Sequence, residues 1–436
     1  MMVRQPRSHV LAIAYPAQGH VGPLMKLCLL IADHGIKVTF VTAACIHARV
    51  LAAAAEINNG KAHNSIDIVS IPDGLDPQDG RKDTIQLSEC TKRVIPSHLE
   101  NLIKKADLSE DHEKITCVIA DATVAWVLDA AKNMGVKTAM FWPTIVAGFA
   151  LNLRIQHLIE TKIIDHNGTP LKNEMIHISP KLPTMSADDL IWDPIRQKII
   201  FGYATSCDAI PNLLPIGPLL STNRPGKPTT SLWPEDSTCL NWLDKQPAQS
   251  VIYVAFGSIA ILYQHQFEEL ALGLELAGRP FLWVVRPNLL DGSKIKYPDG
   301  FLERVADLSK IIDWAPQEQA LAHPSVACFI SHCGWNSTIE GLSMGVPFLC
   351  WPYFADQFLI SNYICDFWKV GLELKQDESG TISRQEVKRK LDELLSDGRI
   401  RQNGLKIQEM AKKSLGEGGS SMKNFETFVE QLKCMR

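Results

Sequence analysis

The sequence lacks three features that would each indicate a class of function. Its 436 residues include 44 basic and 48 acidic ones, so the net charge is near −4 and no run of Lys or Arg favours a nucleic-acid partner. The eleven Cys residues form no C-x-x-C pair, and no His or Cys spacing matches a metal site. We therefore expect reduced thiols, no metal, no cofactor and a cytoplasmic location.

Long hydrophobic runs are also missing. The apolar run nearest the N-terminus covers only Val10–Tyr15, which is too short for a signal peptide or a membrane span. With 46% apolar and 21% charged residues, the composition is that of an ordinary globular enzyme. The length favours two domains over one.

What the first half does contain is an alternation of strands and helices. Its strand runs are continuously apolar, which predicts parallel strands covered on both faces and a doubly wound α/β layout. The predicted strands are His9–Tyr15, Lys37–Thr42, Ile115–Ala120 and Val136–Phe141, and the predicted helices are Gly22–His34 and Val124–Met134.

A stretch rich in Pro, Ser, Thr and Gly, Pro211–Pro234, indicates a linker, after which the alternation restarts. We expect an N-terminal domain over 1–215, a linker over 216–240, a C-terminal domain over 241–415 and a last helix in 416–436 that packs back on the first domain. In the second half the predicted strands are Ser250–Ala255, Phe281–Val285, Ile311–Asp313, Val326–Ser331 and Pro347–Cys350, and the predicted helices are Gln264–Leu276, Thr338–Met344, Arg384–Leu395, Arg399–Leu415 and Ser420–Lys433.

The most informative segment is the run Trp314–Gln357. Within it, His332–Ser337 (HCGWNS) follows a buried strand and precedes a helix. Glycine allows a ligand close to the backbone, and the N–H groups at a helix start favour an anion such as a diphosphate. A structural alternative stays open, because Ser337 and Glu340 also have the spacing of a capping box.

Other residues of the same run fit the remaining parts of a sugar nucleotide. Trp314 could stack on a base and Gln317 could contact its edge, while Glu340 could accept from ribose hydroxyls. The pair Asp356 and Gln357 could bind sugar hydroxyls. Each has a structural alternative, a packed Trp or a solvated polar loop, and their occurrence in one run favours the binding site.

A candidate base lies near the N-terminus. His20 lies between the first strand and the first helix, and an imidazole can accept a proton at neutral pH. Asp121 ends a later parallel strand, so both residues should lie at the same sheet edge. Asp121 could then orient the ring, as the acid of a catalytic triad does. The alternatives are a packed loop histidine and a helix N-cap reinforced by Thr123.

The run Trp314–Gln357 resembles, without a gap, the signature box of the plant family 1 glycosyltransferases that use UDP-sugars. AYPAQGHVGPLMKL, PIGPLL, VAFGS and FADQ extend the resemblance over most of the chain. It implies two doubly wound Rossmann-like α/β domains that face each other across a cleft, the GT-B fold. It also implies a monomeric transferase with His20 and Asp121 as catalytic dyad.

The resemblance assigns the donor residues as well. Trp314 would stack on uracil, with Ala315 and Gln317 at the nucleoside and Glu340 at the ribose. A final Gln in the box goes with glucose, which favours UDP-glucose. The residues implied at the diphosphate and the sugar are Ser258, His332, Gly334, Trp335, Asn336, Ser337, Asp356 and Gln357.

These assignments predict direct displacement with inversion, in which His20 deprotonates an acceptor hydroxyl and UDP leaves without the help of a metal. Trp142 and Thr144 are candidates for acceptor or sugar contacts. An apolar cleft would suit a lipophilic acceptor, such as a flavonoid, another phenolic or a terpenoid.

One region departs from the family. The segment 203–208 runs almost directly into Pro211, so a helix and a strand of the first domain have no counterpart. This keeps a second hypothesis open, a non-catalytic protein that binds a UDP-sugar or another small molecule. A third, a nicotinamide-dependent dehydrogenase, is disfavoured because the first βα turn lacks G-x-G-x-x-G.

Overall fold

The computed structural model describes two compact units. The described residues are 8–57, 66–76, 84–108, 114–166, 168–172, 174–177, 184–186, 213–220, 231–290 and 295–435. Unit 1 comprises Met1–Lys172, Trp192–Trp233 and Glu417–Arg436, and unit 2 comprises Asn173–Ile191 and Pro234–Gly416.

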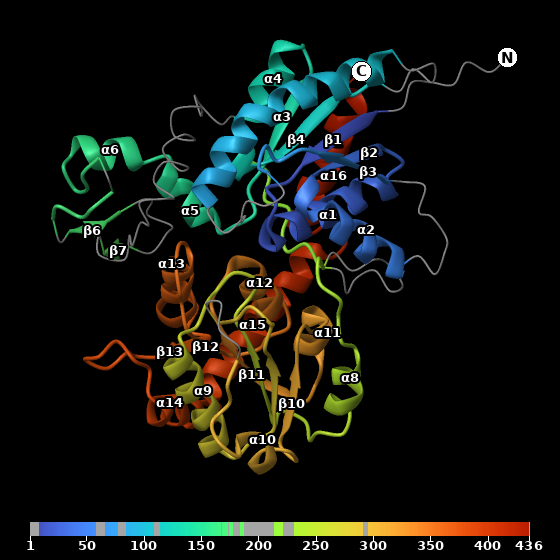
Figure 1. Cartoon of the computed structure of the whole chain (residues 1–436). Helices are drawn as coiled ribbons and strands as arrows, with labels where there is room; N and C mark the ends of the chain where they lie inside the picture. The colour runs from blue at the N-terminus through green and yellow to red at the C-terminus, as the bar shows by residue number, and fades with distance from the viewer. Residues whose placement is uncertain are drawn as a thin grey trace. The chain divides into compact units, whose positions relative to one another are not determined.

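Unit 1 contains a five-stranded parallel sheet with the order β3-β2-β1-β4-β5 (Figure 1). The chain moves outward from β1 to β3 and then returns to the other side of β1 with β4. The point where the direction reverses therefore lies between β1 and β4. The strands are β1 His9–Ile13, β2 Lys37–Ala43, β3 Ile66–Ile71, β4 Cys117–Asp121 and β5 Lys137–Phe141.

Helices cover both faces of this sheet. Val10 and Ala12 of β1 pack in one buried cluster with α1 and α2, whereas Leu11 and Ile13 pack in another with α3 and α4. Because successive strand residues point to opposite faces, the strands read as continuously apolar, as predicted. The helices are α1 Gln18–Asp33, α2 Ala44–Ile57, α3 Thr84–Asp107, η1 Ala122–Val124, α4 Val127–Asn133, α5 Val146–Asn152 and α6 Ile155–Glu160.

The last helix, α16 (Ser420–Cys434), belongs to unit 1 although it ends the chain. Its buried side chains are part of the same cluster as α1. Polar side chains of the helix also hold the segment before the linker, because Ser421 Oγ donates to Gly217 O and Asn424 Nδ2 donates to Pro215 O at 2.8 Å.

Unit 2 contains a six-stranded parallel sheet with the order β10-β9-β8-β11-β12-β13, so its reversal point lies between β8 and β11. Both units thus have the predicted doubly wound layout. The strands are β8 Val251–Ala255, β9 Phe281–Val284, β10 Ser309–Ile312, β11 Val326–Ser331, β12 Phe348–Cys350 and β13 Gly371–Glu373.

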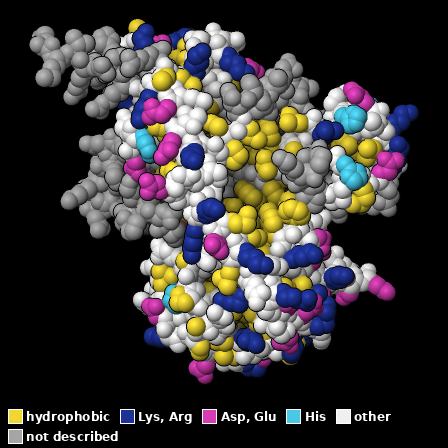
Figure 2. Space-filling view, turned by 180° about the vertical axis from the view of Figure 1, so that it is seen from behind, with side chains coloured by type: hydrophobic (Ala, Val, Ile, Leu, Met, Phe, Trp, Pro, Cys, Tyr) yellow, Lys and Arg dark blue, Asp and Glu magenta, His cyan; other side chains and the backbone are white. Residues whose placement is uncertain are grey.

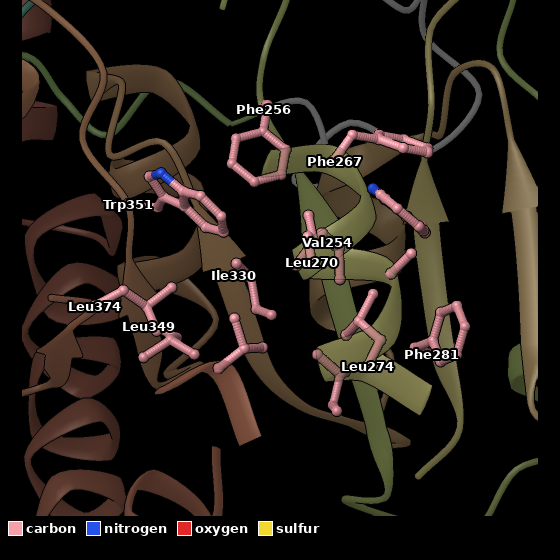
Figure 3. Packing of buried hydrophobic residues seen from close by; sticks show 14 of the residues in the cluster. Val254, Phe256, Phe267, Leu270, Leu274, Phe281, Ile330, Leu349, Trp351 and Leu374 are labelled. Atoms are coloured by element: carbon pink, nitrogen blue, oxygen red, sulfur yellow. The ribbon is translucent and has the colours of Figure 1, made fainter. Parts of the chain in front are cut away.

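The core of unit 2 lies between this sheet and α9 (Gln264–Ala277; Figure 3). Side chains of β8, β9, β11 and β12 meet Phe267, Leu270 and Leu274 there. The other helices are α8 Thr238–Leu243, α10 Phe301–Arg304, α11 Gln317–Ala322, α12 Trp335–Ser343, α13 Gln357–Asn362, η3 Tyr363–Phe367, α14 Arg384–Ser396 and α15 Gly398–Leu415, and a short antiparallel pair joins β6 Met175–Ile176 to β7 Met185–Ser186.

Three predicted helices differ from the observed ones. The predicted helix Gly22–His34 begins four residues earlier, at Gln18, so His20 lies inside α1 and not before it. The predicted helix Val124–Met134 is divided into η1 and α4, and the predicted helix Thr338–Met344 begins three residues earlier, at Trp335. The departure predicted near 200–210 lies outside the described residues.

The surface shows the balance of charge that the composition predicts. Lys and Arg side chains are interspersed with Asp and Glu on the face seen in Figure 2. Among the described residues, no helix has both the length and the apolar character needed to span a bilayer.

Candidate active site

The catalytic candidates of unit 1 lie together at its reversal point. β1 and β4 are neighbours in register, with Ile13 opposite Ala120, so their carboxyl ends meet at one edge. His20 lies in the first turn of α1, and Asp121 is the last residue of β4. Their side chains are joined by a contact of 2.9 Å between His20 Nδ1 and Asp121 Oδ2.

Asp121 uses its two carboxylate oxygens for two partners. Oδ1 accepts from the backbone N–H of Thr123 at 2.8 Å and caps η1, while Oδ2 accepts from His20. The N-cap alternative and the predicted contact with His20 are therefore both observed. Because the carboxylate accepts, Nδ1 carries the ring hydrogen and Nε2 of the neutral ring carries the lone pair.

Burial separates the roles of the two residues. The Asp121 side chain is 0% exposed and the His20 side chain 29% exposed, so the ring can meet a ligand and the carboxylate cannot. The ring of Tyr15 lies edge-on to His20, with 5.2 Å between ring centroids. The site thus contains an oriented imidazole, which is what a general base requires.

The acceptor candidates follow β5, the strand beside β4. Trp142 Nε1 donates to Ile145 O at 3.2 Å, and its ring lies 5.1 Å from that of Phe149. The indole N–H of Trp142 is therefore used within the loop, which leaves its ring faces for apolar contact. Thr144 lies in the same half-buried loop at the same sheet edge.

In unit 2, the half-buried side chain of Gln317 joins several of the candidate residues. Gln317, the first residue of α11, donates from Nε2 to Ser337 Oγ at 2.9 Å and to Glu340 Oε2 at 2.8 Å. Tyr253 of β8 donates its hydroxyl to Gln317 Oε1 at 3.2 Å. Trp314 and the buried Ala315 precede this helix.

These bonds fix the amide of Gln317. Both of its N–H groups donate within the protein, so the side chain can offer a nucleoside only its remaining carbonyl acceptor capacity. Its main effect is to hold the carboxylate of Glu340, which is 7% exposed. Tyr253, which completes the arrangement, was missed by the sequence analysis because it reads as one more apolar residue of a buried strand.

The helix start expected to hold a diphosphate is α12. Its N-cap is Gly334, and the following residues Trp335, Asn336 and Ser337 form the first turn, whose N–H groups lack partners within the helix. Ser337 and Glu340 lie inside the helix, and no side chain caps it. The capping-box alternative is therefore wrong.

The turn before α12 is tightly built. Cys333 has a φ of +63°, a conformation that few non-glycine residues adopt, and its N–H donates to Ser331 Oγ at 3.1 Å. The His332 ring lies against two glycines: a Cβ added at Gly257 would lie 2.5 Å from His332 Nε2, and one at Gly334 would also clash with that atom.

Burial of the ring, followed by the positive charge of Arg286, lowers the pKa of His332 to about 4. Although His332 as a residue is only partly buried, its Nδ1 is fully buried. His332 is therefore neutral at physiological pH and can act as a dipolar donor. Ser258 lies half-buried in the turn after β8, the strand next to β11, and directly follows Gly257.

The sugar candidates follow β12. Gln357 is 4% exposed, and its Oε1 accepts from the backbone N–H groups of Tyr353 at 2.8 Å and Phe354 at 3.1 Å. It therefore shapes the loop before it, in which Ala355 has a φ of +62°. Only its amide N–H groups remain for a sugar. Asp356 is the half-buried N-cap residue of α13.

Among the described residues, no group of three or more His, Cys, Asp and Glu side chains could hold a metal ion.

Comparison with known proteins identifies the family. The sequence profile described as "UDP-glucoronosyl and UDP-glucosyl transferase" matches residues 226–414. UDP-glycosyltransferase 83A1 of Arabidopsis thaliana is 38% identical over 464 positions, which cover 99% of this chain and 98% of the relative. The chain belongs to the plant family 1 UDP-glycosyltransferases. Linamarin synthase 1 of Manihot esculenta is 32% identical, with coverage of 98% of this chain and 97% of the relative.

Solved structures agree with this identification. Os79 of O. sativa in complex with UDP has a TM-score of 0.79 and 26% identity, covering 97% of this chain and 100% of its own. A UDP-glucosyltransferase of Polygonum tinctorium has a TM-score of 0.80 and 26% identity, covering 98% and 99%. The chain is thus a UDP-glycosyltransferase with the GT-B fold of its relatives.

The match to the Arabidopsis protein also bears on the shortened region. It extends over 464 positions, more than the 436 residues of this glycosyltransferase, so the relative contains residues that have no counterpart here. This agrees with a shortened chain, although the described residues do not include the segment where the sequence places the loss.

Proposed function

We propose that this UDP-glycosyltransferase transfers glucose from UDP-glucose to a hydroxyl of a lipophilic plant small molecule with inversion, which gives a β-glucoside. The observation that carries the proposal is the contact between His20 and the buried Asp121, because it leaves Nε2 of the ring as the proton acceptor.

In the proposed reaction His20 Nε2 takes the proton of the acceptor hydroxyl. The acceptor oxygen forms a bond to the anomeric carbon while the bond from that carbon to the diphosphate oxygen breaks, and UDP leaves with the electron pair. Asp121 stabilises the imidazolium that forms. A single displacement inverts the anomeric centre.

For the donor, we propose that Trp314, Ala315, Gln317 and Glu340 bind the uridine. We propose Ser258, His332, Gly334, Asn336 and Ser337 for the diphosphate, and Trp335, Asp356 and Gln357 for the sugar. The α12 start and the half-buried hydrogen-bond network of Gln317 support these roles. No metal and no cofactor take part in the proposed reaction.

Glucose is favoured by Gln357 at the end of the signature box and by two relatives. The Citrus unshiu relative is named limonoid UDP-glucosyltransferase, and the Polygonum tinctorium structure is named as capable of glucosylating indoxyl. Initial rates with UDP-glucose and UDP-galactose test this choice. A preference for the galactose donor would contradict it.

For the acceptor, we propose that Trp142 and Thr144 contribute to an apolar site for a flavonoid, another phenolic or a terpenoid. A mass-spectrometric screen of these classes with UDP-glucose identifies the product. We also propose a monomer in the cytoplasm, which agrees with the free thiols of the described cysteines. Light scattering after gel filtration tests the monomer.

The test of the chemistry is His20→Ala. Loss of a general base should lower kcat by about 100-fold or more, whereas the affinity for UDP, measured by calorimetry, should not change. Asp121→Asn should also lower kcat, because it favours the wrong ring tautomer. His157→Ala, at an exposed histidine of α6, is the control and should keep full activity.

A His20→Ala variant that keeps its turnover would contradict the catalytic role of His20 and Asp121. A wild-type protein that binds UDP-glucose tightly but releases no UDP with any acceptor would favour the second candidate, a non-catalytic binding protein. That candidate draws its support from the residues that this chain lacks relative to its relatives.

A further inference from the structure

A buried arginine of unit 2, Arg286, takes no part in the proposed reaction. Arg286 follows β9, the strand next to β8, and is only 2% exposed. Its Nε donates to Gly257 O at 2.9 Å and its Nη2 donates to Ala260 O. Its Nη1 donates to the backbone and side-chain oxygens of Asn288 at 3.0 and 2.9 Å. The guanidinium thus spans both ends of the turn that contains Ser258.

All four of these acceptors are uncharged. In the part of the chain that the structure describes, no carboxylate pairs with Arg286. Burial lowers the pKa of its guanidinium to about 10, so the group still carries its charge at neutral pH. A buried charge held only by dipoles is unfavourable unless a further negative charge compensates it.

The position of this charge indicates what the compensating group is. Arg286 holds the carbonyl of Gly257, and the Gly257 Cα lies directly against the His332 ring. The charge also reaches His332, where it contributes to the lowered pKa. Arg286 therefore lies behind the groups that we assign to the diphosphate, His332 and the start of α12.

We propose that Arg286 is a positioning residue of the diphosphate site, which fixes the Gly257–Ala260 turn through two carbonyls and supplies a buried positive charge that the diphosphate of the donor neutralises. The inference rests on the proposed binding of a UDP-sugar to unit 2. The hydrogen bonds of Arg286 go to the turn and to Asn288, so the side chain does not need to touch the diphosphate. It acts by holding the turn in place and through the electrostatic field of its positive charge.

The test compares ligands that differ only in their phosphates. Calorimetry gives the dissociation constants of UDP, UMP and uridine for the wild type and for Arg286→Met. The variant should lose affinity for UDP by about 30-fold or more, and for UMP by less, while uridine binding changes less than about twofold. A retained affinity for uridine also shows that unit 2 has folded.

Arg286→Lys separates the two parts of the role. It keeps the charge, but one ammonium cannot reproduce the planar fork that spans Gly257 and Ala260. Its loss of UDP affinity should lie between that of the wild type and that of Arg286→Met. Arg304→Met, at an exposed arginine paired with Glu275, is the matched control and should bind all three ligands normally.

An equal loss for uridine and UDP, or an unchanged affinity for UDP, would overturn the inference. If Arg286→Met does not fold, the ratio of UDP to uridine affinity in Arg286→Lys decides the question in the same way, and an unchanged ratio rejects the proposal. A wild-type protein that binds neither UDP nor uridine would instead contradict the proposed function.

Discussion

Single residues show where the sequence predicts chemistry and where it does not. The proximity of His20 and Asp121 was predicted because each follows a parallel strand, and parallel strands end at one edge. For Gln317, the sequence predicted a polar side chain at the nucleoside but not its hydrogen bonds, because its partner Tyr253 lies 64 residues away. Arg286 gave one local signal, a charge directly after a buried strand, which the sequence analysis did not use.

The lowered pKa of His332 leads to a prediction about how the stability of the folded protein depends on pH. Its pKa is about 4 in the folded protein, against 6.5 for an ordinary histidine. Between these values the unfolded chain binds a proton that the folded protein does not, so stability falls as the pH falls from 6.5 towards 4. Urea unfolding at pH 7.5 and 5.0 should show that wild type loses about 2 kcal/mol more than His332→Gln over this interval. Equal losses in the two proteins would contradict the neutral state of His332.

Buried strands were predicted more accurately than exposed or less periodic elements, for physical reasons. The strands β1, β2, β8 and β11 are buried on both faces and read as apolar runs, so they were predicted within one or two residues. Shorter or less periodic elements were missed. In unit 1 they include α2, the half-exposed edge strand β3, and α3, which contains Pro96, and in unit 2 they include the short helices α11 and α13. The start of α12 was misplaced because Gly334 caps the helix without a polar side chain, while Ser337 and Glu340 imitate a cap inside it.

The glycine at that start gives a prediction about α12. Gly334 has an ordinary φ of −62°, so alanine costs nothing in backbone conformation, but its Cβ would clash with His332 Nε2. Gly334→Ala should displace the ring and weaken UDP binding by about tenfold, or about 1.4 kcal/mol, which lies within the 1–3 kcal/mol typical of overpacking.

Gly398→Ala is the matched control for this variant. No atom lies within 4 Å of a Cβ added at Gly398, the first residue of α15, so UDP binding and the thermal midpoint should not fall. Calorimetry and a thermal melt measure both variants. Normal UDP binding by Gly334→Ala would show that the close contact with His332 is not needed.

At the scale of the whole molecule, both units have a doubly wound parallel sheet, although the sequence contains no visible repeat. Each sheet reverses its direction once, between β1 and β4 or between β8 and β11. His20 and Asp121 lie at the first of these points, and Ser258 and His332–Ser337 follow the two strands of the second. The sequence predicted this layout because periodicity and strand length are local properties. It could not supply the contacts that join distant segments, such as Leu232 N–H donating to Gln18 Oε1 at 2.7 Å.

The last helix shows what such distant contacts contribute to unit 1. Phe425, Val429 and Leu432 of α16 are 6%, 1% and 0% exposed within the core of unit 1, and the Phe425 ring lies 5.3 Å from that of His34. Leu432→Ala should leave a cavity there and destabilise unit 1 by about 2–5 kcal/mol. Met410→Ala, at a side chain of α15 that is 69% exposed, should have no measurable effect.

Two measurements report on the two units separately, because the residues that we assign to UDP all lie in unit 2. Proteolysis at rising temperature should cut unit 1 of Leu432→Ala earlier than unit 1 of the wild type, while UDP affinity at 25 °C stays unchanged. A loss of UDP affinity equal to that of transferase activity would contradict this independence. Loss of activity before loss of UDP binding is expected, since His20 and Asp121 depend on the core that α16 completes.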